Sequence, residues 1–218
     1  MDAALWTLLH VLVLVYWLGG DLGAFYAAGI LSDARQPPAA RAAAARVLGA
    51  VDMAPRTALI LTLPTGLTLA DARAWIELPP PLLLAVWVAA LLWLALAWLI
   101  HLRHLPPSSP LRMADLVIRW LVLAGATAAA AAAILDQLAL PLFLALKLLA
   151  LAAAIGLGLL IRRTLSPFGP AFEQLMRQGA TPEGDAVISG VLARARPAVL
   201  SIWGLLVTAA FLGLWQPQ

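Results

Sequence analysis

The feature that most constrains this chain is the length of its apolar runs. A membrane-spanning helix needs about 20 mostly apolar residues. Six runs meet that need, at residues 4–31, 54–71, 81–102, 113–135, 139–161 and 195–215. The runs are continuous and lack the alternation of polar and apolar residues that a β-barrel requires. The sequence therefore predicts an all-α fold, a polytopic membrane bundle of about six transmembrane helices in one domain over residues 1–218.

The composition supports a membrane protein and excludes several kinds of site. The chain is 63% hydrophobic and 11% charged, whereas a soluble domain carries about 25% charged residues. Cysteine is absent, which excludes disulfides, thiolate metal sites and cysteine nucleophiles. The net charge of +3 is spread over the loops and gives no indication of nucleic-acid binding. We interpret the first apolar run as a retained span, because it is too long for a signal peptide and has no basic segment before it.

The distribution of arginine predicts the orientation. Arginines cluster after the first, third and fifth runs, whereas the connection after the second run holds only Arg73 and that after the fourth holds none. Because basic loops stay in the cytoplasm, we expect both termini outside. Short cytoplasmic helices are expected at residues 34–50, with arginines on one side, and around residues 172–178.

Two ionisable residues lie deep in apolar runs and are predicted at one depth. An ionisable group in the bilayer costs at least about 2.5–3.5 kcal/mol, so each raises a functional question. Lys147 is the only lysine and lies in the middle of the fifth run. At 1.5 Å per residue it lies about 12 Å below the outer surface, and His10 lies about 9 Å below it. His10 alone is equally consistent with a ligand and with a hydrogen-bonded core histidine.

The first run carries a stripe of residues at spacings of three and four. Such a spacing places residues on one helix face, and this face should point into the bundle because it contains an aspartate. Nearby glycines, Gly19, Gly20 and Gly23, would let a neighbouring helix or a flat ligand come close. The stripe consists of Trp6, His10, Leu14, Trp17, Asp21 and Ala24.

The remaining charged residues favour structural roles. Asp21 and Arg119 both lie in the cytoplasmic half, and we predict an ion pair between them. Asp115 with Arg119, and Asp52 with Arg56, could also pair at a spacing of four. His101 and His104 supply only two ligands, so anchoring at the interface is a better interpretation than a metal site. Arg194 and Arg196 are expected to bind lipid phosphates.

Three short motifs resemble the CopD-like superfamily, which includes CopD-type copper-resistance proteins and HemJ-type protoporphyrinogen oxidases. The first is His10 followed by Trp17 and a Gly-Gly pair. The second, DMAPRTALILTLPTGLTLA, has Pro55 near its start and Gly66 about ten residues later. The third, PLFLALKLLALAAAIGLGLLIRR, resembles the W-L-x-x-K-L helix of HemJ-type proteins, with Lys147 on its lysine. Together the motifs cover about a third of the chain.

The resemblance implies a haem-binding redox protein of the bacterial inner membrane. His10 would be the ligand of a haem b iron. Lys147, the residue carried over as functionally important and hence the candidate catalytic residue, would ligate the iron as a neutral amine or pair with a propionate as a cation. Trp6 and Trp17 would contact the porphyrin, with Arg56 and Arg119 as weaker propionate or proton-relay candidates. The implied reaction is oxidation of a porphyrinogen-like substrate or electron transfer to quinone or another redox partner.

Two other function classes stay open. One is a transporter of copper or another metal ion, using Asp21, Arg119, Asp136 and the two cytoplasmic histidines; scattered methionines and the absence of cysteine leave no soft-ligand path for Cu(I). The other is a structural subunit without cofactor, whose polar residues only fix helix register. Beyond the lipid bilayer, the sequence leaves homo-oligomerisation open.

Overall fold

The computed structural model describes residues 2–216, and the regular secondary structure of these residues is all α-helix. Six of its helical segments are long and apolar enough to cross a membrane. This finding confirms the predicted fold class. The helices are α1 (Asp2–Ser32), α2 (Pro38–Val51), α3 (Met53–Ala72), α4 (Pro80–Leu102), α5 (Pro110–Ile134), α6 (Leu142–Thr164), α7 (Phe168–Gln178) and α8 (Pro182–Trp215).

Proline and capping residues explain where the helices begin. Proline occupies the first turn of α2, α4, α5 and α8, where its missing N–H needs no helical partner. Ser109 and Thr181 precede α5 and α8 and accept backbone N–H groups of the first turn. The two short helices that were predicted between spans are present as α2 and α7.

One helix extends well beyond the apolar run that predicted it. The sixth span was predicted to begin at residue 195, and the helix that contains this run, α8, begins at Pro182. Hydropathy identifies only the apolar part of a helix, so it does not predict a polar extension of the same helix. In α8 the cap at Thr181 and two acidic residues in the first turn favour the helix well before its apolar part.

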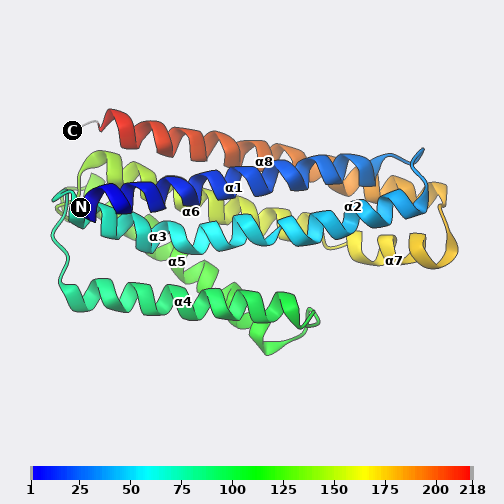
Figure 1. Ribbon diagram of the computed structural model, residues 1–218, viewed down its shortest axis with the longest axis horizontal. Coiled ribbons are helices and arrows are strands. Elements are labelled where there is room, and N and C mark those ends of the chain that lie inside the picture. Colours follow the sequence, from blue (N-terminus) through cyan, green and yellow to red (C-terminus); the bar gives the residue numbers. More distant parts are fainter. Residues whose placement is uncertain (1, 217–218) are drawn as a thin grey trace.

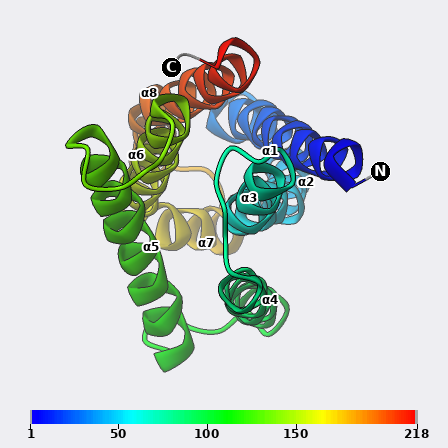
Figure 2. The ribbon, with the colours of Figure 1, turned by 90° about the vertical axis from the view of Figure 1, so that its left-hand side faces the viewer.

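Most of the long helices run along one axis, which α5 crosses obliquely, and the short helices α2 and α7 lie together at one end (Figure 1). The start of α1 and the end of α8 lie at the opposite end (Figure 1). Seen along the axis, α1 and α3 form one side and α6 and α8 another, with α4 and α5 farther out (Figure 2). The main helix pairs in contact are α1 with α3, α6 with α8, and α5 with α6.

Gly20 allows α1 to approach α3 closely. A Cβ added at this position would lie 2.6 Å from the Cβ of Ala54 and 2.8 Å from Cδ of Pro55. Real Cβ atoms do not make such contacts, so the helices pack at this distance only because residue 20 has no side chain. Of the Gly-Gly pair in the first helix, Gly20 therefore has a packing role, whereas a Cβ at Gly19 would meet no other atom within 4 Å.

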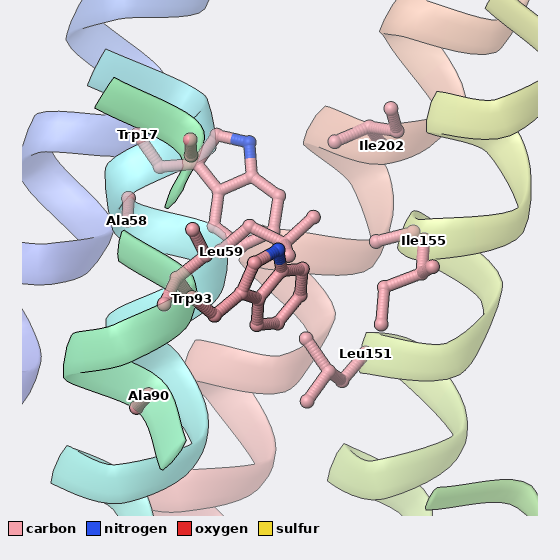
Figure 3. Close-up of a cluster of buried hydrophobic side chains, with 11 residues drawn as sticks. Trp17, Ala58, Leu59, Ala90, Trp93, Leu151, Ile155 and Ile202 are labelled. Carbon is pink, nitrogen blue, oxygen red and sulfur yellow. The ribbon is translucent and has the colours of Figure 1, made fainter. Parts of the chain in front are cut away.

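A core of buried side chains joins the two sides of the bundle (Figure 3). Trp17 from α1 and Trp93 from α4 fill the space between α3 and the pair α6 and α8, and they are only 3% and 6% exposed. Leu151, Ile155 and Ile202 contact them from the other side. Trp17 thus occupies the middle of the bundle rather than a lipid-facing belt.

A second cluster of buried side chains lies where α2 and α7 meet the ends of α1 and α8. Arg41 of α2, which is 1% exposed, bonds to the backbone of Leu31 in this cluster. The Arg41 guanidinium donates to the Leu31 carbonyl (3.0 Å) and to Asp185 (2.6 Å). The sequence predicted a helix here with arginines on one side; in the structure Arg41 is buried and its side chain joins three helices.

Candidate functional site

A cavity of about 550 Å³ lies among α1, α3, α6 and α8, toward the end of the bundle where α1 begins and α8 ends. This volume is in the range of cofactor sites, about 300–1,000 Å³. His10 and Lys147 both line the cavity. The depth argument from the sequence therefore agrees with the structure, which brings together two residues that lie 137 positions apart.

The hydrogen bonds of His10 determine its tautomer. Its Nδ1 lies 2.9 Å from Oγ1 of Thr65. The Thr65 hydroxyl donates its single hydrogen to the backbone carbonyl of Leu61, at 2.6 Å. Oγ1 must therefore accept from His10, so the ring proton is on Nδ1. The lone pair of Nε2 is then free, and no other side chain among residues 2–216 hydrogen-bonds that nitrogen.

Gly66 forms the wall against which the imidazole lies. A Cβ added at Gly66 would lie 3.1 Å from Cε1 of His10 and 3.8 Å from Nε2. The absence of a side chain at this position leaves room for the ring on the face of α3. Thr65 and Gly66 therefore position His10 from two directions, by a hydrogen bond and by shape.

Lys147 reaches the cavity from α6 without an acidic partner. Its Nζ lies 3.0 Å from the position that a Cβ at Gly213 would take, so the amine lies against α8. Among the described residues, no carboxylate lies within 4.0 Å of this amine. The lysine thus retains its full capacity to interact with a bound molecule.

Two other side chains at this cavity complete its chemistry. Trp17 lines the wall beside His10 and is the predicted aromatic contact. Arg73 also lines the cavity, and its Nη2 donates to Oγ1 of Thr7 at 3.2 Å. Neither Thr65 nor Arg73 was predicted from the sequence as part of the site. Arg73 was counted only for topology, although it is the one arginine predicted on the outer side, where His10 and Lys147 lie.

Trp6 and Arg56 do not line this cavity. Trp6 lies against Trp87 of α4, with ring centroids 5.7 Å apart. This neighbour explains the difference, since it holds the Trp6 ring on the side of α1 that faces α4. Arg56 lies near the other end of the bundle and pairs with Asp52 at 2.5 Å, as the spacing of four residues predicted.

A second cavity, of about 330 Å³, lies near that other end and contains Asp21, Arg56 and Arg119. The stripe of the first helix lines both cavities in turn: His10 and Leu14 face the first, Asp21 and Ala24 face the second, and Trp17 borders both. The prediction that this face points into the bundle is therefore confirmed for every member except Trp6.

The predicted ion pair between Asp21 and Arg119 is absent. Both residues line the second cavity, but Arg119 is bound by Asp115, one turn away on the same helix, with Nε and Oδ2 3.0 Å apart. Asp115 also accepts from Trp93 Nε1 (3.0 Å) and from Arg162 (3.2 Å). This buried carboxylate joins α4, α5 and α6. Its pairing with Arg119 is the alternative that the spacing of four residues indicated.

His101 and His104, which were predicted on the cytoplasmic side, lie at the end of α4. The ring of His101 lies 6.0 Å from that of Trp98 and 6.3 Å from that of His104. Within residues 2–216, no group of three or more His, Cys, Asp or Glu side chains is arranged to hold a metal ion.

Comparison of the chain with protein-family models, curated proteins and solved structures found no match. The chain is a polytopic membrane protein with a histidine and a lysine in one intramembrane cavity, and these residues carry the functional argument.

Proposed function

We propose that this protein binds haem b in the first cavity and acts as a membrane redox protein. The observation that carries the proposal is the hydrogen bond from His10 to Thr65. A histidine that ligates a metal usually donates its other ring N–H to a fixed acceptor, which orients the ring and selects the tautomer. His10 has this arrangement: it lines the cavity, and its Nε2 has no hydrogen-bond partner among the described residues.

The lining of the cavity fits such a group. Its walls are mostly apolar, and Trp17, which is buried in the core, borders the cavity on its inner side. Imidazole nitrogen is a suitable ligand for iron. Lys147 can serve as a second ligand if its amine is neutral, or bind a propionate if it is charged. Arg73, also on the lining, is a second candidate for a propionate.

When bound, haem would supply one-electron redox chemistry. The chain itself would hold the iron through His10, neutralise the propionates with a basic side chain and exclude water with its apolar walls. The motif resemblance to CopD-like and HemJ-type proteins extends the proposal to a reaction class: oxidation of a porphyrinogen-like substrate, with electrons passing to quinone. That extension rests on analogy with the motifs alone.

The experiment is an absorption spectrum of the detergent-purified protein, oxidised and reduced, with haem quantified per chain. The wild type should show a Soret band that is lost in His10→Ala. The matched control is Trp6→Phe, which changes an aromatic of the same helix outside the cavity and should keep the band. A folded sample that stays without haem when haem is supplied would refute the proposal, and stoichiometric copper dependent on His10 would replace it with metal transport.

A further inference from the structure

The second cavity collects arginines from four helices. Arg56 comes from α3, Arg119 from α5, Arg162 from α6 and Arg196 from α8. Only two carboxylates line the same cavity, those of Asp21 and Asp52. No role in the proposed haem site uses this cluster, which lies toward the end of the bundle where α2 and α7 lie.

The ion pairs of these arginines leave a positive excess. Arg56 pairs with Asp52, and Asp115 binds both Arg119 and Arg162. Arg196 has no carboxylate within 4.0 Å among the described residues, and its guanidinium lies 5.5 Å from the centre of the Phe25 ring. Asp21 likewise has no ion pair there. With Asp115 included, four guanidinium groups lie near three carboxylates, which leaves one positive charge in excess. Each guanidinium has five N–H donors, so N–H groups remain that the carboxylates do not bind.

The depth of the cluster matches the boundary of the bilayer. Arg196 lies 19 residues before the end of α8 at Trp215, which is about 28 Å along a helix. The hydrocarbon core of a bilayer is about 30 Å thick, so the guanidinium lies near the level of the phosphates on the side with the basic loops. Apolar side chains such as Leu59 and Ile202 line the rest of the cavity.

We infer that the second cavity binds a phosphate group, held by Arg196 with Arg56 and Arg162 around it. Guanidinium groups bind phosphate oxygens by paired, charge-assisted hydrogen bonds, and basic pockets between transmembrane helices are suited to anionic headgroups. The phosphate can belong to an anionic phospholipid that enters from the bilayer or to a soluble phosphate compound that enters from water. The inference is independent of haem binding in the first cavity.

The test compares Arg196 with Arg194, which lies two residues away on the same helix; both are exposed, but only Arg196 lines the cavity. Delipidated protein in neutral detergent is titrated with phosphatidylglycerol, phosphatidylcholine or inorganic phosphate, and binding is followed by native mass spectrometry and by the change in melting temperature. Arg196→Gln and Arg196→Glu are compared with Arg194→Gln and Arg194→Glu.

Saturable binding of phosphatidylglycerol in preference to phosphatidylcholine, weakened about tenfold or more in the Arg196 variants alone, supports a lipid source. Saturable binding of inorganic phosphate with the same dependence on Arg196 supports a soluble source. Equal losses in the Arg194 and Arg196 variants would show general surface charge and overturn the inference. Absence of saturable binding of either phosphate probe to folded wild-type protein would overturn it as well.

Discussion

His10 Nδ1 and Thr65 Oγ1 lie 2.9 Å apart, and this hydrogen bond between α1 and α3 leaves Nε2 of the histidine as the free nitrogen. The threonine acts on the site only through the histidine, so it is a positioning residue. Its contribution can be separated from that of the ligand itself.

Thr65→Val removes the acceptor while keeping the shape of the side chain. Because loss of such a partner typically lowers metal affinity 10–100-fold, we expect haem retention to weaken by about that factor and the midpoint potential to shift. Haem release to apomyoglobin and a redox titration measure the two effects. Thr62→Val is the matched control, since Thr62 lies one turn before Thr65 on α3 and lines the cavity, but its hydroxyl donates to the Ala58 carbonyl and not to the histidine. Equal behaviour of the two variants would contradict the role of Thr65.

Lys147→Met should leave the protein folded and at least as stable to heat, because it removes a cation that has no carboxylate partner in a largely apolar cavity. If Lys147 serves the haem, this variant will change the absorption spectrum or the midpoint potential. Lys147→Arg separates the two roles: it retains the effect of a charge on a propionate but cannot replace an amine ligand. Wild-type spectra and potentials in both variants would indicate that the lysine is only structural.

Asp115→Asn should be far more destabilising than Asp21→Asn. Asp115 accepts hydrogen bonds from Trp93, Arg119 and Arg162, and removing one partner of a buried pair costs about 3–5 kcal/mol. Asp21 has no ion pair among the described residues, so its neutralisation should change stability by less than about 1 kcal/mol. Unfolding in mixed micelles with increasing SDS measures both. The reverse order would restore Asp21 as the structural carboxylate of the bundle.

The orientation can be tested on a chain that has no native cysteine. Exposed positions Glu77 and Ser108 lie in the connections on either side of α4. With both termini outside, Glu77→Cys should react with an impermeant maleimide on intact cells, and Ser108→Cys should react only after permeabilisation. The opposite labelling pattern would invert the predicted topology and place the haem cavity on the cytoplasmic side.

Much of the architecture could be predicted because lipid imposes a simple length rule. Apolar runs locate the spans, and the alternation of arginine-rich and arginine-poor connections predicts which helix ends lie on the same side of the membrane. Those two facts sufficed to bring His10 and Lys147 to one depth. The stripe on the first helix followed from helical spacing alone. The polar beginning of α8 could not be found in this way, because its 182–194 segment is helical without being apolar.

The partners of the polar residues were harder to predict, because they depend on how each helix is rotated about its axis. Thr65 accepts the hydrogen bond of His10 only because α3 turns that hydroxyl toward α1, and the sequence carries no sign of this rotation. Arg119 had two acidic candidates at suitable depth, and the nearer one on its own helix prevailed. Trp6 belongs to the stripe by spacing, yet Trp87 on α4 holds its ring outside the cavity.

The central claim is that His10 holds haem in the first cavity, and the most direct measurement is the haem content and absorption spectrum of purified wild-type and His10→Ala protein. The account predicts a Soret band with about one haem per chain in the wild type and loss of both in the variant, while the variant remains helical and monodisperse. An unchanged spectrum in folded His10→Ala protein, or a folded wild type that takes up no haem, would contradict it.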